Sequence, residues 1–421
     1  MNPGTTDIID IIGVVLFALA IVHTFSTRLF ERFALRCPRH AGLWHLLGEV
    51  EVAFGLWALL LVVCILVVEG RDAATGYLDS RNYTEPMFVF AIMVVAASRP
   101  VLDTVRAAVD VLGRALPLPG AMGFYLVVLA LVPLLGSLIT EPGAMTMGAL
   151  ILSRSVFAAG LSERLKYATI AVLFVNVSIG GTLTPFAAPP VLMVAGKWNW
   201  DMAFMLTQIG WKSALAVGGN ALEAALLFGR ELAALRIHAG DAPAGAPRAL
   251  VAVHFAFLLG VIVFAHHPAA FLGLFLFFLG VAHAYKEHQD RLILREGLMV
   301  AFFLAGLVVL GGKQQWWLQP ALQSMSADAV YYGATALTAI TDNAALTYLG
   351  SLVEGLSDEF KYALVTGAVT GGGLTVIANA PNPAGMAILK EHFRDGAVSA
   401  LWLLLAAIPP TLVAVGAFRL L

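Results

Sequence analysis

Residues 137–146 read SLITEPGAMT and residues 338–347 read TAITDNAALT, and these two stretches decide how the chain is interpreted. Both contain a threonine followed by an acid, with an alanine and a second threonine in the same register. The shared pattern begins at Thr140 in the first stretch and at Thr341 in the second. A matched acid in two distant segments indicates an internal repeat rather than recurring apolar composition.

Each stretch lies at the centre of an apolar segment, at residues 118–153 and 330–355. Charge, proline or asparagine interrupts both segments at that point. Non-helical backbone at membrane depth is tolerated only where protein buries it or where it lines an aqueous cavity. We therefore predict two re-entrant helical hairpins, with Glu141 and Asp342 at their tips.

The composition places the chain in a lipid bilayer. It has 421 residues, of which 60% are hydrophobic and only 12% charged, and its mean hydropathy is +0.85. A soluble domain carries about 25% charged residues. The net charge of −2 excludes a basic surface for nucleic acid, and the two cysteines, Cys37 and Cys64, indicate neither a disulfide framework nor a metal site.

A helix needs roughly 20 apolar residues to cross the bilayer. The sequence predicts an all-α polytopic membrane protein with about ten such spans. They lie at residues 8–24, 43–68, 86–105, 167–195, 203–228, 250–264, 269–284, 297–312, 361–389 and 398–421.

The distribution of basic residues sets the expected orientation. If the N-terminus lies outside and each hairpin counts as no crossing, 18 of the 25 Lys and Arg residues fall in cytoplasmic loops. We expect both termini outside, the polar linker at 229–248 in the cytoplasm, and the cell inner membrane as the location.

Two further blocks repeat in the same order. LSERLKYA at 161–168 matches LSDEFKYA at 356–363, and GGTLTPFAAPP at 180–190 matches GGGLTVIANAP at 371–381. The chain therefore divides into a first half at 1–228, the linker, and a second half at 249–421. Because the halves begin on opposite sides of the membrane, we predict two inverted-topology repeats.

The third pair of blocks interrupts the spans at 167–195 and 361–389 with glycine and proline. Paired interruptions in two repeats are the best sequence pointer to a transporter's binding site. The residues expected to unwind the backbone are Gly180, Gly181, Gly371, Gly372, Gly373, Pro190 and Pro381. The groups expected to coordinate an ion or substrate there are Thr182, Thr184, Thr375, Asn379 and Asn382.

At these residues the chain resembles the ion transporter superfamily, which includes sodium/dicarboxylate symporters, arsenite carriers and NhaD-type sodium/proton antiporters. SIGGTLTPFAAPP at 178–190 and ANAPNPAG at 378–385 look like its unwound segments, and TDN at 341–343 is similar to the second hairpin tip of the NhaD-type antiporters. The most similar members are described as Na+/H+ antiporters. The resemblance implies a homodimer in which three scaffold spans open each half and the hairpins and broken helices move in an elevator-like way.

The chain also departs from these relatives. The symporters typically carry Ser-Asn-Thr without an acid at both tips, where this chain has Glu141 and Asp342. The antiporters carry an acid and an Asn in the first unwound region, where this chain has Ala188 and Ser178.

The residues at the two hairpin tips are expected to bind the ion. An ionised acid at the bilayer centre costs roughly 2.5–3.5 kcal/mol on insertion scales, which favours a functional reason for both acids. Glu141 and Asp342 are expected to bind sodium or exchange it for protons, with neutral oxygens from Thr140, Thr341 and Asn343. The alternative is that each acid only caps a helix N-terminus.

Two functions fit this pattern. The first is a sodium/proton antiporter that works by alternating access, since acidic tips repel anionic substrates. The second is a sodium-coupled symporter of a small anion or carboxylate, which the GGTLTPFAAPP segment favours. Asn220 and Glu223, three residues apart, form either interhelical contacts or a proton path. A channel or membrane enzyme is the weakest class, and no resident cofactor is expected.

Overall fold

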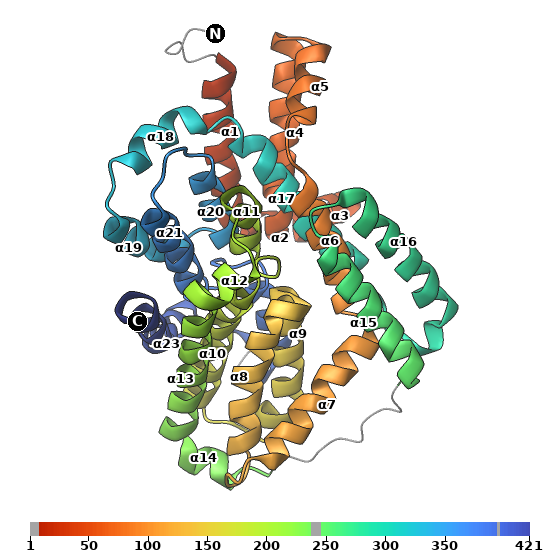
Figure 1. The fold of residues 1–421 in the computed structure, drawn as a ribbon, viewed down its shortest axis with the longest axis vertical. Helices are drawn as coiled ribbons and strands as arrows, with labels where there is room; N and C mark the ends of the chain where they lie inside the picture. Colours follow the sequence, from red (N-terminus) through yellow and green to blue (C-terminus); the bar gives the residue numbers. More distant parts are fainter. Residues whose placement is uncertain (1–7, 237–245, 394–395) are drawn as a thin grey trace. The chain divides into compact units, whose positions relative to one another are not determined.

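The computed structural model describes residues 8–236, 246–393 and 396–421, and the regular structure of these residues is helical throughout (Figure 1). Residues 237–245 of the expected linker lie outside the described residues. The chain forms two compact units. Unit 1 comprises Met1–Phe90, Leu294–Met325 and Tyr348–Ser357, and unit 2 comprises Ala91–Ile293, Ser326–Thr347 and Asp358–Leu421. Each unit therefore draws on both halves of the sequence.

Unit 1 is built around three long apolar helices, α1 (Ile8–Phe25), α4 (Val50–Val68) and α17 (Leu294–Gly311), which pack against one another. The backbones of α4 and α17 meet closely, because a Cβ on Gly306 would lie 2.5 Å from the backbone nitrogen of Gly55. Small residues allow this close approach in membrane helices. The shorter helices of the unit are α2 (Thr27–Arg36), α3 (Ala41–Leu47), α5 (Arg71–Asp79) and α18 (Gln315–Gln323).

The expected span at 86–105 is not one straight helix. Helix α6 (Thr84–Ala96) ends inside this range. Helix α7 (Arg99–Ala115) follows it after a bend of 64°. Ser98 is extended, and Pro100 suits the first turn of a new helix because its missing N–H would be unpaired there anyway. Helix α7 buries one face and carries charge on the other.

Unit 2 contains the predicted hairpins and broken helices. The first hairpin is α8 (Met122–Ile139) and α9 (Glu141–Leu152), which pack together, and the second is α19 (Ala327–Thr338) and the start of α20 (Asn343–Ser351). The broken segments are α10 (Glu163–Gly180) with α11 (Pro189–Trp198), and α21 (Asp358–Gly371) with α22 (Asn382–Leu389). The remaining helices are α12 (Met202–Phe204), α13 (Trp211–Leu227), α14 (Gly229–Ala234), α15 (Arg248–Val263), α16 (Pro268–Ala284) and α23 (Ala400–Leu420).

Helix α10 is the core of unit 2. It contacts both helices of the first hairpin and also α13, α21 and α23. Every residue from Thr169 to Gly180 is buried, which leaves this part of the helix no surface for lipid.

Six of the helices that the structure describes are long and apolar enough to cross a membrane, and seven are if the bent pair α6–α7 counts as one span. The structure thus supports a polytopic membrane protein. The ten expected spans also include α15 and α16, which have 16 and 17 residues and are shorter apolar helices.

Two glycines at matched positions of the repeated blocks allow the broken helices to approach the hairpins. A Cβ on Gly180 would lie 2.7 Å from the carbonyl oxygen of Pro133 in α8. A Cβ on Gly371 would clash with the carbonyl oxygen of Thr335 in α19. Both helix pairs therefore need glycine, because a backbone carbonyl cannot move aside as a flexible side chain can.

We predict that Gly371→Ala lowers the free energy of unfolding by about 1–3 kcal/mol, because overpacking forces backbone shifts. The matched control is Gly218→Ala in α13, where a Cβ meets nothing within 4 Å. This control should gain up to about 1 kcal/mol from alanine's higher helix propensity. Thermal unfolding in detergent, followed by tryptophan fluorescence, measures both. Equal midpoints for the two variants would contradict the close approach.

Candidate functional site

The tip of the first hairpin is strained. Thr140 has φ 68° and ψ 156°, a region that β-branched residues rarely adopt. Holding a residue there costs about 1–3 kcal/mol, and such outliers cluster at functional sites. The conformation ends α8 and starts α9 one residue later, so that Glu141 occupies the first position of α9.

Glu141 is completely buried, and it is the only aspartate or glutamate among the described residues that is buried. Its Oε2 accepts a hydrogen bond of 2.7 Å from Nδ2 of Asn379, in the second unwound segment. Its Oε1 is buried without a partner. Gly181 of the first unwound segment lies against it, since a Cβ there would be 2.8 Å from Cγ of Glu141.

Glu141 belongs to a group of buried polar side chains with atoms that have no hydrogen-bond partner among the described residues. We call this group the oxygen cluster. It comprises Thr140 (Oγ1), Glu141 (Oε1), Asn343 (Oδ1 and Nδ2), Asn379 (Oδ1) and Asn382 (Oδ1). Native proteins leave few buried polar atoms unpaired, so a group of them points to a missing ligand.

Backbone contacts connect the members of the oxygen cluster. The N–H of Asn343 donates to the carbonyl of Ala378, directly before Asn379, at 3.2 Å. Nδ2 of Asn382 donates to the carbonyls of Gly372 and Thr375 at 2.8 and 2.9 Å. The second hairpin tip and the second unwound segment are therefore tied together, and the Asn382 amide presents its oxygen without a partner.

Three threonines expected to coordinate an ion instead fix the unwound segments in place. Thr184 Oγ1 donates to the Ser137 carbonyl at 2.7 Å, and Thr375 Oγ1 donates to the Ala339 carbonyl at 2.8 Å. Thr182 Oγ1 lies 2.7 Å from the Ile179 carbonyl and 2.6 Å from Ser213 Oγ. These hydroxyl hydrogens are used within the protein, although each oxygen retains a lone pair.

The second hairpin tip differs from the first. Asp342 is half-buried, and its Oδ1 accepts from the N–H groups of Ala344 and Ala345 at 2.8 and 3.1 Å. This is the geometry of a helix N-cap, here for α20. Thr341 is also half-buried, and its hydroxyl donates to the Asp342 carbonyl at 3.3 Å.

The glycines and prolines predicted to unwind the backbone lie where the helices break. Gly372 faces Ser178 and Asn343, and Gly373 packs on the backbone of Val175 in α10. Pro190 is in the first turn of α11, and Pro381 directly precedes α22. Each proline thus stands where a new helix starts and a backbone N–H is dispensable.

Asn220 and Glu223 of α13 lie in different environments. Asn220 is buried and donates to Asn176 Oδ1 at 2.8 Å, whereas Glu223 is exposed on α13. Asn176 in turn donates to the carbonyls of Leu129 and Val217 at 2.8 and 3.1 Å. The two buried amides therefore join α8, α10 and α13.

Sequence reasoning missed the positioning role of Ser137, Asn176 and Ser178. Ser137 Oγ donates to the Gly180 carbonyl at 2.7 Å and accepts from the Leu183 N–H at 2.9 Å. Ser178 Oγ donates to the Val369 carbonyl at 2.7 Å, which joins the two broken helices. The sequence feature that could have indicated this role is that each of the three is a polar residue within an apolar segment.

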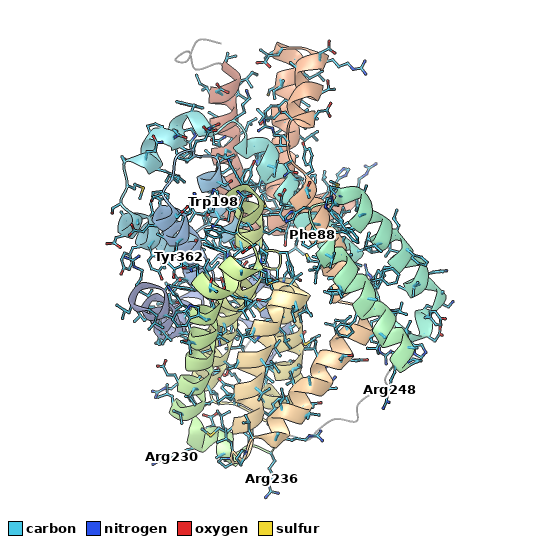
Figure 2. The ribbon with its side chains drawn as sticks, viewed as in Figure 1. Phe88, Trp198, Arg230, Arg236, Arg248 and Tyr362 are labelled. Atoms are coloured by element: carbon cyan, nitrogen blue, oxygen red, sulfur yellow. The ribbon has the colours of Figure 1, made fainter. Side chains whose placement is uncertain are left out.

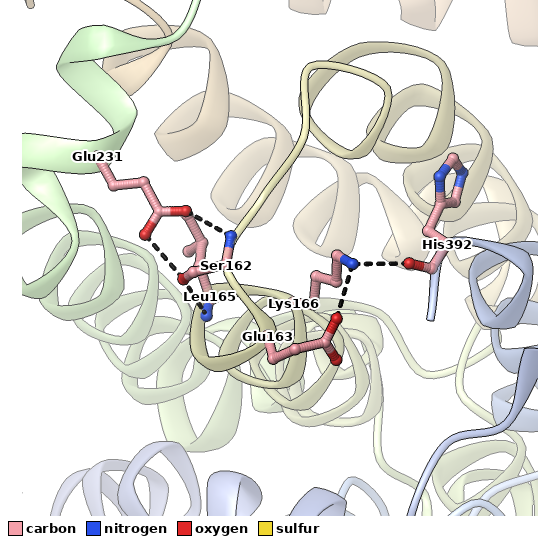
Figure 3. A network of polar contacts seen from close by, with 6 residues as sticks. All are labelled: Ser162, Glu163, Leu165, Lys166, Glu231 and His392. Carbon is pink, nitrogen blue, oxygen red and sulfur yellow. Dashed lines mark hydrogen bonds and ion pairs between the residues drawn. The ribbon is translucent and has the colours of Figure 1, made fainter. Parts of the chain in front are cut away.

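The end of α10 away from the site is held by a polar network (Figure 3). Glu231 of α14 accepts from the N–H and the hydroxyl of Ser162 at 2.7 and 2.8 Å. Lys166 donates to Glu163 at 2.9 Å and to the carbonyl of His392, beyond α22, at 2.7 Å. One end of α10 is thus fixed while the other unwinds at the site.

The oxygen cluster offers one carboxylate and several neutral oxygens. Hard cations prefer oxygen ligands, and transporter sites take them from side chains and unwound backbone. No group of three or more His, Cys, Asp and Glu suited to a metal ion occurs within the described part of the chain. A cation bound here would be cargo coordinated mainly by neutral groups.

A protein-family model described as "Putative Na+/H+ antiporter" matches residues 8–421 of this chain. This match spans both hairpins, both unwound segments and every member of the oxygen cluster. No curated protein matches the chain.

We predict that Thr140→Gly raises the unfolding midpoint in sodium-free detergent solution. Relief of about 1–3 kcal/mol of backbone strain should exceed the roughly 0.5–1 kcal/mol that glycine's flexibility costs. The control is Thr140→Val, which removes the hydroxyl but keeps the β-branch and hence the strain, and it should show no such gain. A lower midpoint for the glycine variant than for the valine variant would show that the tip is unstrained.

Proposed function

The chain belongs to this Na+/H+ antiporter family, and we propose that it exchanges sodium for protons across a membrane by alternating access. The observation that supports the exchange most directly is the buried Glu141 carboxylate, with one oxygen held by Asn379 and the other without a partner. The remaining members of the oxygen cluster would complete the cation site.

Burial of Glu141 makes exchange obligatory. An ionised carboxylate in a low-dielectric environment costs far more than a neutral one unless it is paired. Because no basic side chain among the described residues binds Glu141, this carboxylate must hold either a proton or a cation whenever the site is closed to water. One carboxylate cannot hold both, so the loading of one ion releases the other.

The neutral groups determine which cation fits. Thr140, Asn379 and Asn382 each present an oxygen that no protein donor occupies. Such oxygens replace part of a cation's hydration shell without adding charge, which keeps the loaded site neutral. A monovalent cation with one carboxylate meets this condition, and sodium is the ion that the family description names.

We assign different roles to the two acids. Glu141 binds the exchanged ions, and Asp342 caps α20 and adds negative potential near the site. The assignment rests on burial, which is complete for Glu141 and partial for Asp342, and on the two backbone N–H groups that Asp342 already accepts.

The alternative function, sodium-coupled symport of a small anion, has less support. An anionic substrate beside Glu141 needs a positive group to offset the repulsion. No lysine or arginine is buried among the described residues. Antiport therefore agrees better with the charges available at the site.

The proposed arrangement in the membrane follows the sequence prediction: an inner-membrane homodimer of inverted repeats, with both termini outside and the linker at 229–248 in the cytoplasm. Figure 2 shows Trp198 at the opposite end of unit 2 from Arg230 and Arg236. Tryptophan gathers at membrane interfaces and basic residues on the cytoplasmic side, which supports this orientation.

We predict that Glu141→Gln abolishes cation-driven proton movement, because the amide can neither release a proton nor balance a cation. The measurement uses proteoliposomes that contain a pH-sensitive dye, with an imposed pH gradient and additions of sodium, lithium or potassium. Wild-type protein should dissipate the gradient with sodium.

Asp342→Asn is the comparison variant. Asparagine is as good an N-cap as aspartate, so the fold of α20 should survive. We expect exchange to continue with an apparent sodium affinity lowered by no more than about tenfold, or 1.4 kcal/mol. Exchange that survives in Glu141→Gln but disappears in Asp342→Asn would reverse the assignment of the two acids.

The orientation gives a separate prediction. In a background without Cys37 and Cys64, Arg236→Cys should react with a membrane-impermeant maleimide only from the cytoplasmic side. Lys197→Cys, an exposed position next to Trp198 at the end of α11, should react only from outside. The reverse labelling pattern would mean that the topology is inverted.

A further inference from the structure

A cavity of about 930 Å³ lies in unit 2, away from the oxygen cluster. It is formed by the end of α7, the start of α8, the turn that follows α9 and the segment that follows α14. Four arginines line it: Arg106, Arg114, Arg154 and Arg236. Figure 2 shows Arg236 beyond α14, at the same end of the unit as Arg230.

The arginines of this cavity form no ion pair with an acid in the part of the chain that the structure describes. None of the four forms an ion pair or hydrogen bond with any residue in the described part of the chain. Asp110 is the only acid in the lining. It lies four residues from both Arg106 and Arg114 on α7, yet it pairs with neither.

A neighbouring arginine, in contrast, forms ion pairs with acidic side chains. Arg99 lines a smaller adjoining cavity of about 140 Å³, together with Arg106 and Arg154. It pairs with Asp103 at 3.4 Å and with Asp290 at 3.8 Å. The chain therefore supplies carboxylates to Arg99 and leaves the larger cavity with an excess of three positive charges.

Apolar side chains flank the arginines. Leu118 lines the cavity, and Val111 and Leu112 lie on α7 between Arg106 and Arg114; the three are 38%, 66% and 46% exposed, respectively. Arginine groups that converge beside exposed aliphatic side chains suit a ligand with an anionic head and a hydrocarbon body. Guanidinium groups bind phosphate oxygens in a bidentate manner, and basic pockets on the cytoplasmic side bind acidic lipid head groups.

We propose that this cavity binds a phosphate group, and that the source of the phosphate is the head group of an anionic phospholipid. The phosphate lies among Arg106, Arg114, Arg154 and Arg236, and the acyl chains lie along Val111, Leu112 and Leu118. The bound lipid joins α7 and the segment after α14 to the base of the α8–α9 hairpin, whose tip carries Glu141.

The test measures the unfolding midpoint of delipidated full-length protein in detergent during titration with phosphatidylglycerol. Phosphatidylcholine and inorganic phosphate are titrated in parallel. We expect phosphatidylglycerol to raise the midpoint, with little effect of the other two. Arg114→Gln/Arg154→Gln/Arg236→Gln should weaken the apparent lipid affinity at least about tenfold, as loss of charge-assisted hydrogen bonds predicts.

Two control variants distinguish loss of the lipid site from a general loss of positive charge and from structural damage. Arg32→Gln/Arg36→Gln/Arg39→Gln removes the same charge from exposed positions outside the cavity and should keep the wild-type lipid response. Arg114→Lys/Arg154→Lys/Arg236→Lys preserves the charge and should recover part of the affinity, which a purely structural loss would not.

Equal weakening in the Arg32/Arg36/Arg39 variant would overturn the site, because it would show general attraction to a basic surface. A midpoint raised as strongly by inorganic phosphate as by phosphatidylglycerol would overturn the lipid source. An unchanged lipid response in the cavity variant would overturn the proposal as a whole.

Discussion

The burial of one carboxylate is the constraint on which the rest of unit 2 depends. Glu141 is completely buried, and no lysine or arginine of residues 8–236, 246–393 and 396–421 is bound to it. A charge in that position must be neutralised by a proton or a cation. The hairpin tip, the two unwound segments and the asparagines that reach toward them form the surroundings that this requirement needs.

Close backbone contact keeps those surroundings in place. Gly180 and Gly371 let the broken helices approach the hairpin helices, and Thr184 and Thr375 donate to hairpin carbonyls. These hydrogen bonds pair backbone carbonyls near the ends of the hairpin helices α8 and α19, as a low-dielectric environment demands. Contacts of the same kind occur in both sequence halves, which supports the proposed repeat.

The two hairpin tips are similar in sequence but differ in the contacts of their acidic side chains. Glu141 and Asp342 occupy equivalent positions in the repeated pattern and were expected to share one role. Glutamate has one more methylene, and its carboxylate reaches Asn379 in the second unwound segment, whereas the shorter aspartate side chain accepts from the first N–H groups of its own helix. The length of the side chain therefore gives different contacts to two residues that occupy equivalent positions in the repeated pattern.

The sequence by itself determined the membrane class, the positions of both hairpins and both helix breaks, and the five residues that form the oxygen cluster. These follow from hydropathy and from glycine, proline and acids inside apolar runs, which are local properties of the chain. Tertiary structure alone decided that α6 and α7 separate at Ser98, that Asn220 is buried while Glu223 is exposed, and that Asn379 meets Glu141. Such outcomes depend on which helices pack together, because a contact between residues more than 200 positions apart leaves no local pattern.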